Sequence, residues 1–314
     1  MKDANDIERV LVVGSGVMGN SIAQVFATSG ISVALVDVDE KVLSHAINLI
    51  KSGLTTLADC GKIPSGRIPS ILSHIKLSTN LTEMASDADF IIEAVNEVPD
   101  VKKKVFSQLD EICPTDTVIA SNTSGLDIFS IAEIKRPDRL VIAHFFAPAN
   151  IIPLVEIVPG SKTSPEVVSF TKKLLQRVGK SPIVLKEFVP SFIVNRLQNA
   201  MGLAAMEMLE KGWASPEDID RAIKYSLGVR LPIIGVVQSI DFNGLDLVRN
   251  ILKSIGKDSS FFDKKVEQGH LGVKSGKGIY DYRGRSEAEI LRKRDKLFLL
   301  MIDYLTNIHA FDPI

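Results

Sequence analysis

Three glycines and one aspartate near the start of the chain have a spacing that could hold a phosphate-bearing ligand. Gly14, Gly16 and Gly19 form a GxGxxG pattern after an apolar run, and Asp37 ends the next apolar run. The first glycine permits a tight turn, the second lets the backbone approach a pyrophosphate, and the third lets a helix pack closely on a strand. Asp37 could then accept hydrogen bonds from the ribose of an adenosine. The pattern predicts a dinucleotide site.

A histidine and a glutamate further along could move a proton. His144 ends the apolar run RLVIAH, and Glu156 lies at the centre of LVEIV. A carboxylate fixes the tautomer of an imidazole and stabilises the imidazolium, so the pair could take a proton from a hydroxyl while hydride leaves the same carbon for a nicotinamide. A structural ion pair is the alternative, and spacing alone does not choose between them.

Other polar side chains follow neighbouring apolar runs. The run FIIEAVNE carries Glu93 and Glu97, and VIASNTSG carries Ser121, Asn122, Thr123 and Ser124. Each has an ordinary explanation, because Asn, Ser and Thr are common in turns and a glutamate after a strand is often solvated. Ligands of open parallel sheets bind at the carboxyl ends of strands, however, and all these residues would meet there.

The elements that must position these residues alternate between apolar strands and amphipathic helices up to about residue 187. This alternation predicts an α/β fold with a doubly wound, mainly parallel sheet. After that point the apolar spacing becomes helical, and Ser215 followed by Pro216 is typical of a helix start. We therefore predict a dinucleotide-binding domain at 1–187 and an all-helical domain at 188–314, which includes an extra C-terminal helix.

Composition and charge narrow the function classes. The 314 residues have a formal net charge of -1, which gives no electrostatic reason to bind nucleic acid or an anionic membrane. No run is long and apolar enough for a membrane helix. Cys60 and Cys113 form no CxxC pair, so we expect reduced thiols in a cytoplasmic protein and no metal. Asp37 and Asp39 would repel a 2′-phosphate, which favours NAD over NADP as the cofactor.

In order and spacing, six stretches resemble the L-3-hydroxyacyl-CoA dehydrogenase family: GSGVMGNSIAQ, IIEAVNEVPDVKKKVF, ASNTSGL, HFFAP with LVEIV, PSFIVNRL and GVKSGKGIYDY. The resemblance covers roughly residues 8–282. It implies a Rossmann-like domain followed by a helical substrate and dimerisation domain. It also implies a homodimer and NAD-dependent oxidation of a 3-hydroxyl to a 3-keto group in a small-molecule substrate.

The resemblance also implies roles for individual residues. His144 is similar to the family's catalytic base and Glu156 to its partner, while Ser124 and Asn195 match residues that complete the substrate site. The cofactor-binding residues that it implies, together with those of the glycine pattern, are Gly14, Gly16, Val17, Met18, Gly19, Asp37, Glu97, Lys102, Asn122 and Lys274.

Some positions differ from the family pattern. Ser191 stands where the family usually has glycine, and the stretch LTTLADCGKI lacks the lysines that acyl-CoA members typically carry there, with Lys62 and Arg67 nearby. The stretch LPIIGVVQ is closer to the branch that contains gulonate dehydrogenases, a lens crystallin and a pyridoxine-breakdown dehydrogenase. The substrate is thus a short-chain L-3-hydroxyacyl-CoA or a small hydroxy acid or alcohol without CoA. A non-catalytic NAD-binding protein is a third reading, and the intact Ser124, His144, Glu156 and Asn195 set argues against it.

Overall fold

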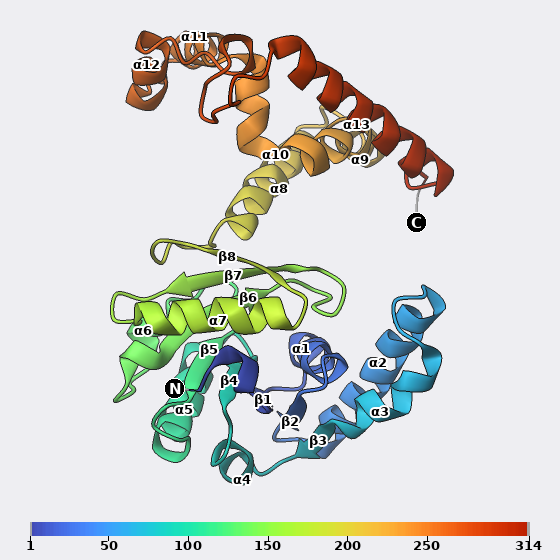
Figure 1. Ribbon diagram of the computed structural model, residues 1–314, viewed down its shortest axis with the longest axis vertical. Helices are drawn as coiled ribbons and strands as arrows, with labels where there is room; N and C mark the ends of the chain where they lie inside the picture. The colour runs from blue at the N-terminus through green and yellow to red at the C-terminus, as the bar shows by residue number, and fades with distance from the viewer. Residues whose placement is uncertain (1, 313–314) are drawn as a thin grey trace. The chain divides into compact units, whose positions relative to one another are not determined.

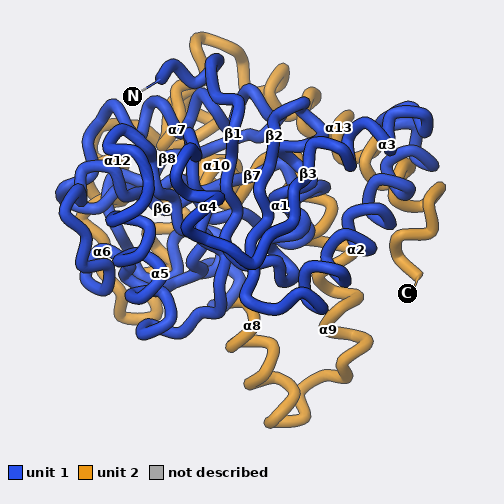
Figure 2. The backbone as a smooth tube through the Cα atoms, turned by 90° about the horizontal axis from the view of Figure 1, so that it is seen from below, with its two compact units in different colours: residues 1–200 blue, residues 201–314 orange. Residues whose placement is uncertain are grey.

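The computed structural model describes residues 2–312 and divides the chain into two compact units that meet between Ala200 and Met201 (Figure 2). Unit 1 is built on one sheet with helices on both faces, and unit 2 is helical (Figure 1). The predicted fold class, an α/β doubly wound sheet followed by a helical region, is confirmed. The domain boundary at 187/188 stays a prediction.

Eight strands form the sheet in the order β3-β2-β1-β4-β5-β6-β7-β8. Their bounds are β1 Arg9–Val13, β2 Ser32–Val36, β3 Ile75–Ser78, β4 Phe90–Glu93, β5 Val118–Ser121, β6 Leu140–Phe145, β7 Leu154–Pro159 and β8 Ser181–Val184. Every neighbouring pair is parallel except β6 and β7. The sheet is therefore mainly parallel, as predicted, and its one antiparallel pair contains His144 and Glu156.

Seven helices of unit 1 cover the two faces of the sheet (Figure 1). One face packs against α1 Val17–Thr28, α2 Glu40–Asp59, α3 Ile68–Ser73 and α7 Pro165–Arg177. The other packs against α4 Leu81–Ala85, α5 Pro99–Ile112 and α6 Ile128–Ile131. Side chains of β1 alternate between the two cores, Val10 and Val12 on one side and Leu11 and Val13 on the other. Burial on both faces explains why this strand reads as an unbroken apolar run.

The strand order places a switch point beside β1. The chain leaves β1 to form β2 on one side and returns to form β4 on the other. Helices on either side of this point diverge, which opens a crevice at the carboxyl ends of the strands. Gly14, Glu93 and Asn122 directly follow or end β1, β4 and β5, so the sheet brings the predicted site residues to one edge.

The structure differs from the sequence-based expectation between residues 40 and 80. The sequence from 40 to 73 predicts one long helical region, but in the structure α2 ends at Asp59, and α3 begins at Ile68 after a 3-10 turn. The strand β3 and the helix α4 were not predicted. Both are short, and β3 is an edge strand with half-exposed side chains, so its alternation was too weak to recognise.

The helical region begins with α8 Val194–Glu210, which crosses the boundary between the units. It continues with α9 Pro216–Ala222, a π-helical turn at Ile223–Leu227, α10 Gly228–Asn243, α11 Leu245–Ser254, α12 Ser260–Glu267 and α13 Glu287–Asn307. The side chain of Ser215 accepts a hydrogen bond from the backbone nitrogen of Asp218, which confirms the predicted helix start. The expected C-terminal helix is α13, which opens with a capping box between Ser286 and Glu289.

Unit 2 has few buried apolar side chains among its described residues, namely Val229, Leu245, Val273, Tyr282 and Ile290. Buried Asp241 accepts hydrogen bonds from the backbone of Ile279 and Tyr280 and from the Tyr282 hydroxyl, which fixes the GKGIYDY segment.

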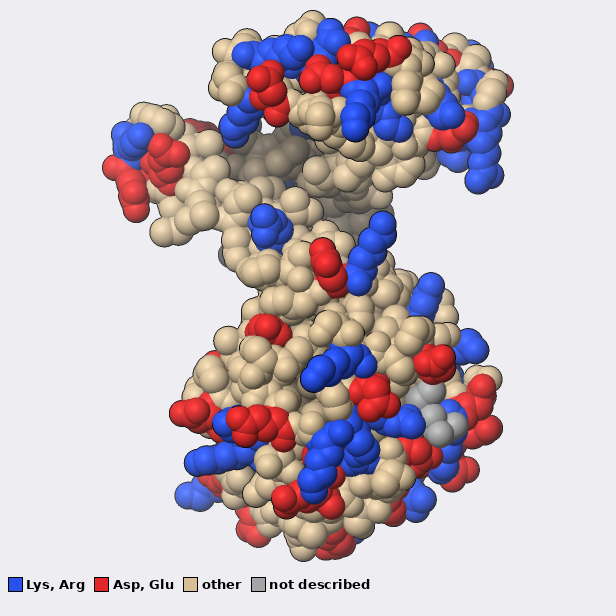
Figure 3. Space-filling model, turned by 90° about the vertical axis from the view of Figure 1, so that its left-hand side faces the viewer, with Lys and Arg blue, Asp and Glu red and all other residues tan. Residues whose placement is uncertain are grey.

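Within residues 2–312 no single helix is long and apolar enough to cross a membrane, although the bent pair Pro216–Asn243 and Leu245–Ser254 has the required length and composition. Basic and acidic side chains are interspersed on the face drawn in Figure 3.

Candidate active site

The glycine turn between β1 and α1 leaves space for a ligand at one of its three glycines. Gly14 has a φ of 95°, and a Cβ there would lie 2.5 Å from the carbonyl oxygen of Ala94. A Cβ on Gly19 would overlap the carbonyl oxygen of Gly14. A Cβ on Gly16 would meet nothing within 4 Å. Packing therefore requires glycine at the first and third positions, while the open backbone at Gly16 fits a pyrophosphate.

The N-terminus of α1 adds a positive electrostatic potential next to Gly16, which favours a bound anion. Gly16 is the N-cap and has no side chain to bond the first N–H groups of the helix. These N–H groups and the helix dipole together attract an anion. Val17 and Met18 form the first turn, and both line the cavity next to it.

Asp37 is held at the end of β2 by the turn itself. Its Oδ2 accepts hydrogen bonds from the backbone nitrogen and the hydroxyl of Ser15, at 2.7 and 2.9 Å, and its Oδ1 accepts one from the backbone nitrogen of Val38 at 2.8 Å. The link to Ser15 was not predicted, because a serine between two turn glycines carries no distinctive signal.

Two cavities meet at the glycine turn. The first, of about 390 Å³, has Gly14 and Asp37 in its wall. The second, of about 600 Å³, has Ser124 and His144 in its wall, and Gly16 borders both. An extended dinucleotide fits this arrangement, with the adenosine near Asp37, the pyrophosphate at the turn and the nicotinamide in the second cavity.

His144 and Glu156 are brought together by the antiparallel register of β6 and β7, which pairs them directly. His144 Nδ1 lies 2.9 Å from Glu156 Oε2, and the glutamate side chain is fully buried. The other carboxylate oxygen accepts hydrogen bonds from the backbone nitrogens of Ile193 and Val194, both at 3.0 Å. An ionised carboxylate can only accept, so it places the imidazole proton on Nδ1 and leaves a lone pair on Nε2.

Aromatic rings surround the imidazole. The ring centroids of Phe146 and Phe192 lie 4.5 and 5.3 Å from that of His144. Phe192 is buried and has a φ of 51°, and Ser191 before it has a φ of 64°. Left-handed backbone favours glycine, so Ser191 holds a conformation that is strained for a residue with a side chain. The strained turn directs the chain from the sheet into α8.

Four further predicted residues, namely Glu97, Asn122, Ser124 and Asn195, lie in the wall of the second cavity. The backbone nitrogen and hydroxyl of Ser124 donate to Glu97 Oε1 at 2.8 and 3.2 Å. Asn195 Nδ2 donates to the carbonyl oxygen of Ser124 at 3.1 Å, and Asn122 Oδ1 accepts from the backbone of β6. Burial alone would raise the pKa of Glu97, but the Thr123 hydroxyl, Lys102 and the Ser124 backbone outweigh it and lower that pKa.

The two lysines predicted to bind the cofactor line neither cavity. Lys102 is 1% exposed and lies behind Glu97, with its Nζ 2.6 Å from Glu93 Oε1 and 3.1 Å from Glu97 Oε2. Lys274 belongs to unit 2, where its Nζ lies 2.7 Å from both carboxylate oxygens of Asp246. Their contacts with NAD stay predictions.

Sequence reasoning also missed two features of the site. Glu93, for which solvation was the ordinary explanation, has no exposed surface. Gln198 lines the second cavity, and its position three residues after Asn195 could have indicated this, because residues three apart share one face of a helix.

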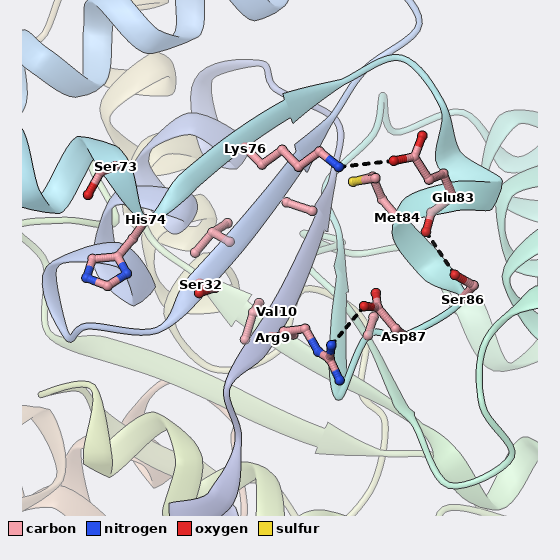
Figure 4. A pocket seen from close by; sticks show the side chains of 13 residues that line it. Arg9, Val10, Ser32, Ser73, His74, Lys76, Glu83, Met84, Ser86 and Asp87 are labelled. Carbon is pink, nitrogen blue, oxygen red and sulfur yellow. Dashed lines mark hydrogen bonds and ion pairs between the residues drawn. The ribbon is translucent and has the colours of Figure 1, made fainter.

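A separate cavity of about 550 Å³ lies at the opposite ends of β1 and β2, near β3 and α4 (Figure 4). Its charged side chains pair with one another: Arg9 with Asp87 at 2.9 Å, and Lys76 with Glu83 at 3.0 Å. Because these charges already have partners, the cavity shows no distinct ligand chemistry.

The comparison with protein families covers both parts of the chain. Residues 9–188 match the family described as 3-hydroxyacyl-CoA dehydrogenase, NAD binding domain, and residues 192–282 match its C-terminal domain. The chain belongs to the 3-hydroxyacyl-CoA dehydrogenase family. It is an NAD-dependent dehydrogenase that acts on a CH–OH group, as the names of its relatives in this family indicate.

Members of this family with different named substrates are similar to the chain. A 3-hydroxybutyryl-CoA dehydrogenase from Clostridioides difficile is 37% identical, over 87% of this chain and 99% of that protein. A 5-formyl-3-hydroxy-2-methylpyridine 4-carboxylate 5-dehydrogenase from Mesorhizobium japonicum is 30% identical, over 88% and 91%. The crystal structure of a 3-hydroxyacyl-CoA dehydrogenase from Archaeoglobus fulgidus matches with a TM-score of 0.79 and 31% identity, over 95% of this chain and 99% of that one.

Proposed function

We propose that the protein oxidises the 3-hydroxyl of a short-chain L-3-hydroxyacyl-CoA to the 3-keto form, with His144 as the base. The observation that carries this proposal is the direct pairing of His144 with Glu156 at the wall of the cavity that borders the glycine turn. A buried carboxylate that orients an imidazole toward a substrate cavity is the arrangement expected of a general base with its partner.

Each residue of the site then has a defined part in the reaction. NAD, which the glycine turn and Asp37 would hold, would supply the acceptor for the hydride from C3 of the substrate. His144 Nε2 takes the hydroxyl proton, and Glu156 stabilises the imidazolium that results. The hydroxyl of Ser124, which donates to Glu97 Oε1 in the structure, lies in the same cavity wall, and once turned toward the substrate it would donate to the oxygen whose single proton goes to His144. Phe146 and Phe192 limit the access of water to the imidazole.

The charge of the cavity wall supports a thioester as the substrate. Its ionisable members are Glu97 and His144, and none of the described residues that line it is a lysine or arginine. A free carboxylate next to the reacting carbon would need a cation, whereas a thioester carbonyl needs only neutral donors. Asn195 and Gln198 carry amide groups that can donate to such a carbonyl.

A second candidate is the same reaction on a small hydroxy acid or alcohol without CoA. The helical hairpin of α2 and α3 carries Thr56, Ala58 and Asp59 near its tip, where the resemblance implies lysines in acyl-CoA members. The relative from Mesorhizobium japonicum is named for a pyridine carboxylate. Of the two candidates, the cavity wall favours the CoA ester and the hairpin favours the small substrate.

The deciding experiment compares NAD reduction with L-3-hydroxybutyryl-CoA and with free hydroxy acids and alcohols, L-gulonate included, at matched concentrations. The proposal expects turnover of the CoA ester alone. Turnover of a free hydroxy compound with the CoA ester inert would replace it by the second candidate. The His144→Gln variant is the control, because its residual rate with each substrate gives the background that does not depend on the base.

A lysine and an arginine of the hairpin provide a further check. Lys62 is exposed near its tip, and the Arg67 guanidinium donates to the carbonyl of Thr28 at 3.4 Å. If CoA is bound, Lys62→Ala is expected to raise KM for the CoA ester several-fold without changing kcat, because a distant phosphate contact supplies uniform binding. The KM of a truncated thioester that lacks the nucleotide should stay unchanged.

We also propose that the protein is a homodimer that pairs through α8. None of the residues of α8 is buried, and large apolar side chains lie along it, among them Met201, Leu203 and Met206, which are 47%, 67% and 55% exposed. Exposed apolar surface of this kind, next to the small buried core of unit 2, is typical of a protein interface. In a symmetric dimer, α8 of a second copy would bury this surface against its own apolar side chains.

The oligomeric state tests this directly. Sedimentation velocity should show a dimer for the wild type and a monomer for Leu203→Glu. The same substitution at Leu49 of α2, an exposed leucine away from α8, should leave the dimer intact. A monomeric wild type would refute the dimer.

The free thiols of Cys60 and Cys113 support the proposal of a reducing compartment such as the cytoplasm.

A further inference from the structure

At the wall of the second cavity lies a cluster of three charged side chains from β4, α5 and the segment between them, two of them buried. The ammonium of Lys102 lies 2.6 Å from Glu93 Oε1 and 3.1 Å from Glu97 Oε2. Glu93 and Lys102 are 0% and 1% exposed, and Glu97 alone of the three lines the cavity. We call these three residues the Glu93 cluster.

Neutral groups complete the hydrogen bonding of the cluster. Glu93 accepts from the backbone nitrogen of Val95 at 2.8 Å and from the hydroxyl of Ser121 at 2.6 Å. Glu97 accepts from the hydroxyl of Thr123 at 2.6 Å and from Ser124. Within residues 2–312, Lys102 is the one cation in a salt bridge with these two carboxylates, so two carboxylates and one ammonium leave a net charge of -1. Within the protein this charge is screened less than a surface charge would be.

The nicotinamide ring changes charge in the reaction, because it is positive in NAD and neutral in its reduced form. A fixed negative charge next to the ring favours the oxidised cofactor over the reduced one. We propose that Glu93, which is fully buried and does not line the cavity, sets the relative affinity for oxidised and reduced NAD through the net negative charge of the Glu93 cluster. This inference rests on the proposed placement of the nicotinamide in the second cavity.

The readout is the ratio of the dissociation constants of NADH and NAD, measured by calorimetry on the full-length protein without substrate. Glu93→Gln keeps the size of the side chain and makes the cluster neutral. The proposal expects the ratio to fall by roughly three- to thirtyfold, since NAD binding weakens and NADH binding is nearly unchanged. If Glu93 only maintains the fold, both constants should rise together and the ratio should stay constant, which would overturn the proposal.

A double variant separates charge from geometry. Glu93→Gln with Lys102→Met leaves Glu97 as the single charge and restores the net charge of the cluster to -1. The proposal expects the ratio to return toward the wild-type value, although two more native contacts are lost. A ratio that falls further in the double variant would also overturn it. Ser121→Ala is the matched control, because it removes a hydrogen bond to Glu93 without a change of charge, and the ratio should hold.

Glu97→Gln gives a second route to a neutral cluster if Glu93→Gln does not fold, because the Glu97 side chain is 38% exposed and its replacement disturbs the core less. The ratio should fall here as well, and an unchanged ratio would refute the charge effect.

Failure of the proposed function and failure of the Glu93 proposal give different results. If His144 is not the base, His144→Gln retains its turnover, while the ratio of dissociation constants in the Glu93 cluster variants still responds to charge.

Discussion

His144 and Glu156 lie opposite each other in the register of β6 and β7, and 2.9 Å separates His144 Nδ1 from Glu156 Oε2. The loop at residues 146–153 reverses the chain between them, so positions far apart in the sequence become direct neighbours. The second oxygen of Glu156 binds the backbone at the start of α8. One carboxylate therefore orients the proposed base and also fixes the helix that carries Asn195.

Replacement of His144 by glutamine is expected to lower kcat by about 10²–10⁴-fold, the contribution of a positioned general base. Affinity for NAD should stay close to that of the wild type, because the glycine turn and Asp37 are untouched. Stopped-flow turnover and calorimetry with NAD measure the two effects separately. A loss of less than about tenfold in kcat would rule out His144 as the base.

Replacement of Glu156 by glutamine should reduce both turnover and stability. The amide can still accept from Ile193 and Val194, but if its nitrogen faces His144 the imidazole proton moves to Nε2, where it blocks proton abstraction. We expect kcat to fall by about 10²-fold or more, and the free energy of unfolding to fall by about 1–3 kcal/mol. If the folded variant retained its turnover and lost only stability, the pair would be a structural ion pair.

Replacement of Asp37 by serine together with Val38→Arg is expected to shift the cofactor preference toward NADP. The carboxylate that repels a 2′-phosphate is removed, and Val38, which is 96% exposed, offers a place for a guanidinium next to it. The ratio of kcat/KM for NADP over NAD should rise at least about tenfold. Val38→Arg alone is the control and should still prefer NAD. An unchanged ratio in the double variant would mean that Asp37 does not contact the ribose.

Lys180 predicts a pH dependence of stability. Its ammonium donates to the carbonyl oxygens of Ala149 and Ile152, and burial lowers the pKa of Lys180 below its usual 10.5. Below the lowered pKa both states are protonated, and the full cost of burying the charge is present. Between that pKa and 10.5 the folded protein releases the proton while the unfolded chain keeps it, so stability rises with pH.

Thermal or urea unfolding of the wild type and Lys180→Met from pH 7 to pH 10 measures this effect. The stability of the wild type relative to the variant should increase toward the alkaline end of the range. The lost hydrogen bonds to the two carbonyls give an offset that does not vary with pH. Parallel stability curves for the two proteins would show that burial does not perturb the titration of Lys180.

Much of the sheet could be predicted from the sequence because its strands are buried on both faces. β1, β4 and β6 are runs of apolar residues next to turn signals, and the polar residues after them mark the edge where ligands bind. The short edge strand β3 has no such run, and nothing local predicts that β6 and β7 are antiparallel.

The catalytic pair could be proposed from residue types, but its geometry depends on pairing between strands. Lys102 shows the limit of local information, because Lys102, Lys103 and Lys104 follow one another in the sequence. Only the position on α5 that faces the sheet brings Lys102 to Glu93, while Lys103 pairs with Glu133 on the surface. The close packing at Gly19, in contrast, could be predicted from the GxGxxG pattern. The backbone that Gly19 packs against belongs to Gly14, which is part of the same short motif.

The bond between Asp37 and Ser15 has a consequence for how cofactor use could change in evolution. A single substitution at Asp37 would remove an obstacle to a 2′-phosphate and, in the same step, release the two Ser15 groups that brace the turn. An intermediate with Asp37 lost and no compensating basic residue would bind both cofactors poorly. Descendants of this chain would therefore tend to retain their present cofactor even while their substrates diverge.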